Sequence, residues 1–568
     1  MKNNTLHRFK QILGASLFCL MAADMPAFAA VPPTSGTLLD GVKPPPQQVE
    51  QNNKPSVTIQ QDEQPDQSKS KEKIAVSRFR LSGELPLLEP ELLSQLKRYE
   101  GRELTLDELN QAAGDLTGYL RRQGYLVAFA YLPAQSITDG VVEIAIVPGK
   151  YGELIINSAA HSSPSYLKNM LRCVKPGSMI RQAPLDRALL LLNDLSGIRV
   201  NASLRPGKTS GTADLVLEAG DTKRISGAIY SDNWGNPYSG RVRSGIELNV
   251  NNPGGLGDQL SLGAMVTENT ELKNYNALYN RPLGVNGARL SISHSRMDYT
   301  LGDIFSSAGA SGVANTDSAS VSYPVVRSRS FNLSGSLGYD QKHMADDIVQ
   351  SSSYARKNSS VWNAALTGNF SDNVLGGAFN SFSLNHYVGS LSLQDAATKA
   401  VDDATAKSAG HFSKTLLSYQ RQQYLADHLD FFFSFTGQLA NTNLDSSEKL
   451  YLGGASGVRA FSQGEAAGDQ GYRLSGEFRW QLKGLSKGDR HVQLVAFYDY
   501  GSVMSNKNPW AGAGQNRRSL MGAGFGLRWQ QDNVFSYRLD YAFKIGDEPS
   551  ANDTNKNGRL WLQAVRYL

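Results

Sequence analysis

From Lys223 to the end of the chain, apolar and polar residues alternate in one segment after another. In the segment 535–545, aromatic and aliphatic side chains occupy the odd positions, and polar or charged side chains occupy most even ones. Similar alternation recurs at 242–250, 331–340 and 430–436. A period of two indicates β-strands with one apolar and one polar face. A transmembrane β-barrel has this pattern, with apolar side chains facing lipid and polar side chains facing the lumen.

A soluble β-sandwich would show a similar alternation, so the pattern alone leaves two architectures open. Aromatic residues gathered on one parity and charged residues on the other favour the barrel. At ~20–22 residues for each strand and its loop, the region 223–568 holds an even number near sixteen antiparallel strands. The segments 344–360 and 394–410 are rich in Asn, Asp and Ser and are expected to be long extracellular loops.

The N-terminus reads as a secretory signal peptide over residues 1–29. Lys2, Arg8 and Lys10 form a basic end, an apolar stretch follows, and Ala27-Phe28-Ala29 gives an A-x-A cleavage site. A lipoprotein signal using Cys19 is disfavoured because the bulky Phe18 precedes it. The signal peptide also supports the barrel, because it places the chain beyond the inner membrane of a bacterium.

Composition excludes several classes of function. The net charge of +5 is modest for 568 residues and gives no nucleic-acid signature. Gly207-Lys208-Thr209 lacks the first glycine of a phosphate-binding loop, because Ala202 stands there. The eight histidines have no metal-ligand spacing, and Cys173 is the single cysteine after the signal peptide. We therefore expect no catalytic site, no cofactor, no metal and no nucleic-acid partner.

Residues 30–71 are rich in Pro and Gln and read as a tether. A short docked helix near Leu38 and Leu39 and a plain disordered linker are two readings of its start. Residues 72–151 and 152–222 then repeat one small α/β module, which is an internal duplication. In the first module we expect Leu126–Leu132 to form a strand at the edge of its sheet.

A glycine-rich loop near residue 455 carries one arginine, Arg459, and leads into an alternating strand that starts at Tyr472. A buried arginine needs an acidic partner. Asp499 is the best candidate because it lies on the next strand and shares the lumen parity of Gln493.

Several motifs resemble one family, the two-partner secretion transporters (TpsB type) of the outer-membrane insertase superfamily. The first module resembles the first POTRA domain of that family, and the second resembles its second. The residues that carry this resemblance are Leu132-Pro133-Ala134-Gln135, Gly140 to Ile144, Gly149 to Gly152, Leu191 to Ile198 and Leu204-Arg205-Pro206-Gly207.

The barrel resembles the same family in its lumen loop and in the facing wall. Val458-Arg459-Ala460-Phe461 is similar to the family's loop motif, and Phe497-x-Asp499-x-Gly501 is similar to its partner motif. Two residues depart from the family pattern. Ala460 stands where glycine is usual, and the chain ends in Leu568 where such barrels usually end in an aromatic residue.

The resemblance implies a sixteen-stranded barrel in the bacterial outer membrane, with the POTRA domains in the periplasm. The implied function is recognition of one large exoprotein partner and its translocation, unfolded, to the cell surface. Its passenger would be a hemolysin, adhesin, toxin or heme-acquisition protein, and its other partners outer-membrane lipids and lipopolysaccharide. We expect a monomeric barrel and capture of the passenger by β-augmentation at Leu126, Val127, Ala128, Phe129, Ala130, Tyr131 and Leu132. The alternatives are an outer-membrane protein assembly factor or a diffusion porin.

Overall fold

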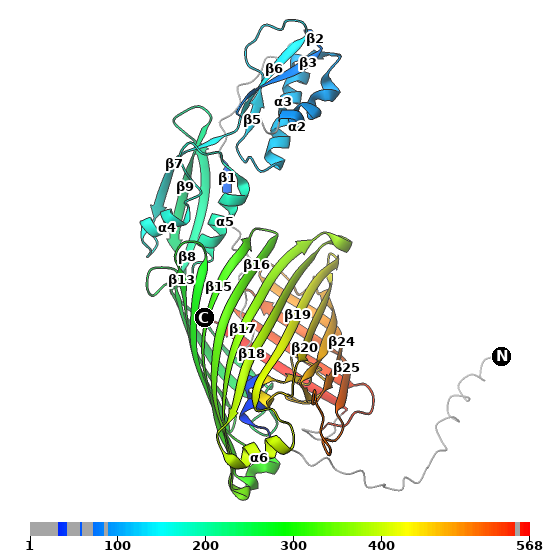
Figure 1. The fold of residues 1–568 in the computed structure, drawn as a ribbon. Helices are drawn as coiled ribbons and strands as arrows, with labels where there is room; N and C mark the ends of the chain where they lie inside the picture. Colours follow the sequence, from blue (N-terminus) through cyan, green and yellow to red (C-terminus); the bar gives the residue numbers. More distant parts are fainter. Residues whose placement is uncertain (1–31, 43–56, 60–71, 85–88, 551–556) are drawn as a thin grey trace, which may run out of the picture. The chain divides into compact units, whose positions relative to one another are not determined.

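The structure is a computed structural model and describes residues 32–42, 57–59, 72–84, 89–550 and 557–568 (Figure 1). The predicted signal peptide, residues 1–29, lies outside the described residues. The described chain comprises two small α/β modules, a barrel, and two short pieces of the segment that precedes the modules.

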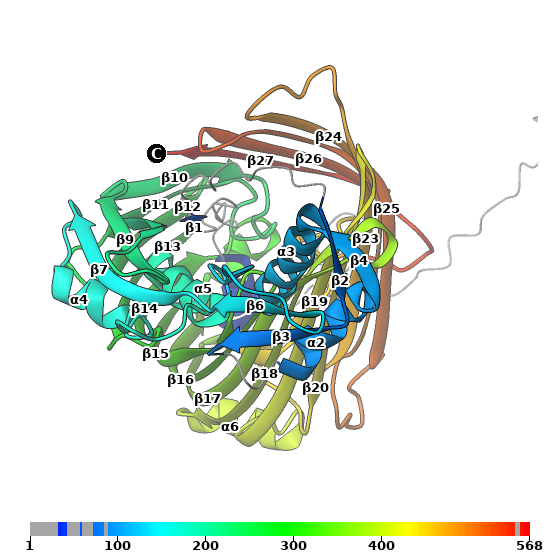
Figure 2. The ribbon, with the colours of Figure 1, turned by 90° about the horizontal axis from the view of Figure 1, so that it is seen from above.

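The barrel is closed and antiparallel and has sixteen strands, which confirms the predicted fold (Figure 1 and Figure 2). The first strand, β10, pairs with the last, β27, with Ile229 opposite Arg566. The backbone N–H of Leu568 donates to the carbonyl of Gly227 at 2.9 Å, so the terminal leucine also contributes to closure. The strands are β10 (Ile225–Asp232), β11 (Arg243–Asn251), β12 (Gln259–Thr267), β13 (Leu272–Leu283), β14 (Ala288–Thr300), β15 (Ala310–Arg327), β16 (Phe331–Ile348), β17 (Ser353–Asp372), β18 (Ala378–Leu393), β19 (Gly410–Ala426), β20 (Leu429–Ala440), β23 (Gln470–Gln481), β24 (Arg490–Met504), β25 (Arg517–Gln531), β26 (Phe535–Lys544) and β27 (Gly558–Tyr567).

Each barrel strand sorts its side chains as the alternation predicts. On β23, Phe478 and Trp480 are 52% and 60% exposed on the outer wall, whereas Glu477, directly before Phe478, is 5% exposed. Apolar side chains on the outer wall are stabilised by lipid, which takes the place of a protein core. The polar face is thereby left to line the lumen.

The direction of each strand follows from the first one, because β10 begins three residues after the second module ends. Turns at that end are short, and the longer loops lie at the other end, at 394–409, 441–469 and 505–516. One expected loop is wrong. Residues 344–360 form the top of the β16–β17 hairpin, whose turn is the short helix η5 (Val349–Ser351). Their polar composition reflects a sheet that continues beyond the apolar band.

The first module packs two helices against a sheet of order β3-β6-β5. Thr105 and Glu108 cap the longer helix, α3, reciprocally at its N-terminus. Its core includes Leu92, Leu96 and Leu116, none of them exposed. The elements are β2 (Lys73–Val76), β3 (Arg78–Gly83), α2 (Glu89–Leu96), η3 (Lys97–Tyr99), β4 (Arg102–Thr105), α3 (Leu106–Arg122), β5 (Phe129–Tyr131) and β6 (Val141–Val147).

The second module repeats this arrangement with a sheet of order β1-β8-β9-β7. Gly207-Lys208-Thr209 lies in the connection between β8 and β9, so it is a turn and not a phosphate loop. Cys173 is a half-buried free thiol. No helix among the described residues is long and apolar enough to span a membrane. The elements are β7 (Lys150–Ser158), α4 (Pro164–Met170), α5 (Gln182–Asn193), β8 (Ile198–Pro206) and β9 (Thr212–Asp221).

The expected edge strand at 126–132 is shorter than predicted. Only Phe129–Tyr131 pair with β6, as β5. Val127 belongs to the turn after α3, and the N–H of Ala128 donates to the carbonyl of Tyr125 at 3.3 Å. Packing of Leu126 and Val127 against the core of the second module keeps them out of the sheet.

Two pieces of the predicted tether are ordered. The helix α1 (Ser35–Leu38) and the turn η1 (Leu39–Val42) correspond to the short docked helix that was one of the two interpretations of this segment. Strand β1 (Val57–Ile59) pairs in parallel with β8 of the second module, with Thr58 opposite Ser203. The tether therefore contributes one strand to a sheet that it precedes in sequence.

Candidate gate in the barrel lumen

Between β20 and β23 the chain leaves the wall and forms a hairpin, the lumen loop, defined as residues 441–469. Two short strands, β21 (Leu450–Tyr451) and β22 (Ala467–Gly468), pair at its stem. At its tip the apolar side chains are almost fully buried: Val458 and Phe461 are 0% and 1% exposed. They pack with residues of β24, β25 and β26 in one apolar cluster. The loop tip is therefore seated on the inner wall.

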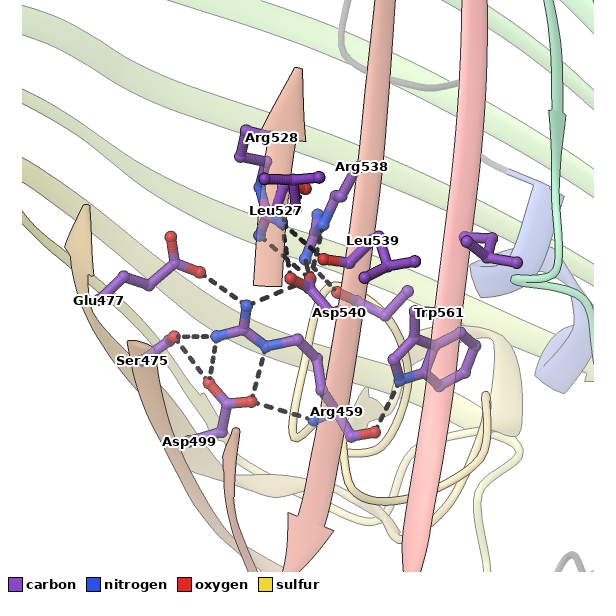
Figure 3. A network of polar contacts seen from close by, with 12 residues as sticks. Arg459, Ser475, Glu477, Asp499, Leu527, Arg528, Arg538, Leu539, Asp540 and Trp561 are labelled. Carbon is purple, nitrogen blue, oxygen red and sulfur yellow. Dashed lines mark hydrogen bonds and ion pairs between the residues drawn. The ribbon is translucent and has the colours of Figure 1, made fainter. Parts of the chain in front are cut away.

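Arg459 is the polar centre of this contact, and Figure 3 shows how the wall surrounds it. Its Nε and Nη2 donate to the two carboxylate oxygens of Asp499, both at 2.8 Å. Its backbone N–H donates to Asp499 Oδ2 at 3.1 Å. The indole N–H of Trp561, on β27, donates to the Arg459 carbonyl at 2.6 Å. Side chain and backbone are thus both fixed, and the structure places the expected partner Asp499 against Arg459.

Two further carboxylates approach the same guanidinium (Figure 3). Arg459 Nη1 lies 2.7 Å from Glu477 Oε1 and 3.4 Å from Asp540 Oδ2. Arg528 and Arg538 also contact Asp540, at 2.6 and 2.8 Å. Each acid therefore has at least one arginine, and the network joins four strands, β23 to β26.

Burial makes this network costly to break. Arg459 is 2% exposed and Asp499 is fully buried. Burial alone would lower the pKa of Arg459, but the hydrogen bonds and charge of Asp499 outweigh it and raise the pKa above its usual value. The guanidinium also lies 3.4 Å from the centroid of the Phe497 ring. Removing one partner of such a buried pair typically costs ~3–5 kcal/mol.

The departure at Ala460 has a structural explanation. Ala460 is not among the residues with positive φ, so its position does not need glycine. Its methyl group packs on Gly522, where an added Cβ would lie 2.6 Å from it. Gly501 has a similar role, because a Cβ there would lie 2.8 Å from Leu452 Cδ2. The loop thus fits the wall through small residues on the wall side.

The base of the lumen loop has a second set of ion pairs, which was not predicted from the sequence. The short helix η7 (Ser446–Glu448) places Glu448 2.5 Å from Lys342 and 2.8 Å from Lys414. Asp445, just before it, lies 2.9 Å from Lys357. The three lysines lie on β16, β17 and β19, and their lumen parity is the signal that would have pointed to them.

The N-terminal segment 33–42 contacts both the loop and the wall. The backbone N–H of Ser35 donates to Asp346 at 2.7 Å, and Gln463 of the loop donates to Asp40 at 3.2 Å. Arg243, on β11, donates to the carbonyl of Gly41. Gly36 lies so close to Ser446 that an added Cβ would clash at 2.4 Å. Segment and loop therefore fill the lumen together.

The expected capture residues lie apart from this centre, in the first module. Phe129 and Tyr131 are 39% and 45% exposed, and their ring centroids are 5.9 Å apart. The N–H of Ala130 donates to Thr117 of α3 at 2.9 Å, so α3 covers part of the β5 edge.

Both the sequence and the fold are similar to those of known proteins. Residues 74–149 match the POTRA domain, ShlB-type. The heme/hemopexin transporter protein HuxB of Haemophilus influenzae is 29% identical over 84% of both chains. The outer membrane transporter CdiB of Dickeya dadantii is 24% identical over 77% of both. The structure of CdiB from Escherichia coli superposes with a TM-score of 0.68 at 19% identity, covering 89% of this chain and 93% of that one.

The family profile of the haemolysin secretion/activation proteins matches residues 211–529, which is more than half of the chain. It spans the lumen loop, Arg459 and Asp499. The chain therefore belongs to the haemolysin secretion/activation protein ShlB/FhaC/HecB family, the outer-membrane transporters of two-partner secretion.

Proposed function

We propose that this chain exports one large secreted partner protein and that its lumen loop closes the barrel between transport events. The observation that carries the gate is the buried contact of Arg459 with Asp499, Glu477 and Asp540. Transport is the activity that we assign, since members of the family are transporters, and we assign no catalysis.

A gate is needed because an open barrel of sixteen strands would leak solutes. The loop is rich in glycine and cannot hold a position by its backbone alone. The Arg459 network supplies the anchor at the tip, and the Glu448 and Asp445 pairs supply one at the base. Passage of a polypeptide requires these contacts, and those of the N-terminal segment, to be released.

For capture of the passenger, we propose β-augmentation in the POTRA region. Two edges compete for this role. The edge at β5 is short and partly covered by Thr117 but carries the exposed pair Phe129 and Tyr131. The edge at β8 already holds strand β1 of the chain's own tether, so its backbone accepts an added strand. We favour β8 and keep β5 as the alternative.

The experiment expresses this chain in a bacterium together with a large exoprotein, which is sought among the genes beside its own. We expect the exoprotein in the medium with the intact chain and in the periplasm without it, and a higher resting conductance with Arg459→Ala, whose lumen loop has lost its anchor. Secretion that is independent of this chain would contradict the proposal. Because one relative is named a heme/hemopexin transporter protein, the secreted protein is also tested for binding of heme and of hemopexin.

A further inference from the structure

The outer wall of the barrel is taller on one side than on the other. On β16 the apolar band runs from Phe331 to Tyr339, a height of ~20 Å at a rise of ~3.3 Å and a tilt of ~40°. The strand then continues to Ile348, another ~20 Å along the same tilt. By contrast, β26 ends at Lys544, directly after its last aromatic residue, Phe543. The tall side stands well above any hydrocarbon.

The tall side has a sharp boundary at one level of the sheet. Ile292, Ala319, Tyr339, Trp362 and Val388 lie opposite one another on five neighbouring strands, β14 to β18. They face outward, as the 51% and 65% exposure of Ile292 and Trp362 shows. Tyr339 and Trp362 pack with ring centroids 5.0 Å apart, a pair typical of the membrane interface.

One level above, every outward side chain is polar. This row crosses six strands and consists of His294, Asp317, Gln341, Ser360, Ser390 and His411. The next row continues the pattern with Arg296, Asn315, His343, Asn358 and Ser392. We call these two rows the polar wall.

The polar wall presents hydrogen-bonding groups and little net charge. His294 Nδ1 lies 2.7 Å from Asp317, and Arg296 binds Asp298 at 2.6 and 2.9 Å. Gln341 Oε1 accepts from Tyr339 and from Ser360, at 2.8 and 2.6 Å, which leaves its amide N–H donors for an acceptor outside the barrel. Because its charges are paired among themselves, this surface suits sugar hydroxyls better than isolated phosphates.

A hollow in the outer wall joins the apolar band to the polar wall. Its volume is about 420 Å³. The apolar side chains of Ile292 and Ala319 line it below, and His294 and Asp317 line it above, with the small Ala277 opposite His294. An apolar hollow under a row of hydrogen-bonding groups fits an amphiphile whose chain lies below its polar head.

We propose that the polar wall binds lipopolysaccharide, with an acyl chain in the hollow and the core sugars against the two polar rows. The surface is continuous with the lipid-facing band of this outer-membrane protein. The outer leaflet of the outer membrane is built from lipopolysaccharide. The core sugars lie outside the acyl chains, on the side where β16 continues beyond its apolar band. The inference is independent of the gate and of passenger capture.

The test uses a cysteine reporter in cells. Ser392→Cys, in a chain that also carries Cys173→Ser, places one exposed thiol in the upper row. A membrane-impermeant maleimide is added to intact cells that make either full-core or core-truncated lipopolysaccharide. We expect labelling to be several-fold slower with the full core. Ala511→Cys, in the loop 505–516, is the matched control and should label equally in both strains.

A second variant distinguishes specific binding of lipopolysaccharide from nonspecific shielding by the lipid that surrounds the barrel. Gln341→Ala, His343→Ala and Ser360→Ala together remove hydrogen-bonding groups of the polar wall on β16 and β17, the two strands before that of the reporter, and we expect them to restore fast labelling in full-core cells. Heat-modifiable migration on gels verifies that this variant is a folded barrel, and Gln341→Ala alone replaces it if it is not. Equal labelling with both cores would overturn the proposal, as would protection that the triple variant leaves intact. Protection that depends on the passenger instead would assign the wall to the passenger and equally overturn it.

Discussion

Arg459 has three carboxylates around it, and they differ in how many contacts each makes with this arginine. Asp499 receives the bidentate contact and the backbone N–H, whereas Glu477 and Asp540 are held mainly by other arginines. Removing Arg459 therefore strands Asp499 most, because its other side-chain partner among the described residues is Ser475. At this scale the anchor is one arginine and one aspartate, supported by a larger network.

The first prediction is a double-mutant cycle on this pair. Arg459→Ala and Asp499→Ala should each reduce secretion strongly, since the first leaves the Asp499 carboxylate buried without an arginine and the second removes the bidentate contact of Arg459, at a typical cost of ~3–5 kcal/mol. The double variant should lose little beyond the worse single one, because both changes break one interaction. Secreted passenger and single-channel conductance are measured for all four proteins. Independent, additive losses would show that the two residues do not act as a pair.

The second prediction concerns pH and the base of the loop. Burial would raise the pKa of Asp445, but the charge of Lys357 outweighs it and lowers the pKa to about 2. The unfolded value is ~3.9, so this pair contributes fully above pH ~4 and is lost as the pH falls towards 2. Conductance of the closed barrel should therefore be constant from pH 8 to 5 and rise below ~4. Asp445→Asn should raise the conductance of the closed barrel at neutral pH. An unchanged conductance would show that the Asp445–Lys357 pair does not anchor the loop.

At the scale of elements, strand β1 occupies an edge that a passenger strand would use. Thr58→Pro should weaken β1, because proline removes a backbone donor. Binding of a passenger fragment to the full chain in detergent should then tighten several-fold. Phe129→Ser with Tyr131→Ser leaves the β5 backbone intact and should have little effect. The reverse pattern would make β5 the capture edge.

The sequence predicted these elements unevenly, for physical reasons. Alternation sets which face a residue occupies, so the lumen position of Asp499 followed from its parity alone. The edge strand at 126–132 was predicted too long. The apolar residues Leu126 and Val127 pack on the neighbouring module and do not pair in the sheet. The pairing of β1 with β8 and the lysines around Glu448 depend on contacts between distant segments, which no local pattern encodes.

At the scale of the whole molecule, orientation in the membrane is the property that transport requires. The modules that precede β10 must meet the passenger in the periplasm, so the long loops must lie outside the cell. The loop 394–409 carries the helix α6 (Ala396–Ala404) and the basic residues Lys399 and Lys407. The hairpin 344–360 also carries basic residues, Arg356 and Lys357, but within paired strands.

Trypsin added to whole cells should separate these segments by their backbone, not by their composition. A protease needs a backbone that can extend into its cleft. The turn at Lys407 is held locally, by hydrogen bonds to Asp402, whereas the β16–β17 hairpin is held by pairing along both strands. We therefore expect cleavage near Lys407 and none at Lys357, and mass spectrometry of the fragments reads this directly. Lys407→Gln with Lys399→Gln should abolish the cut and leave secretion unchanged, which is the matched control. Residues 72–222 should survive in intact cells and be degraded once the outer membrane is permeabilised. Their loss in intact cells would reverse the orientation and, with it, the direction of transport.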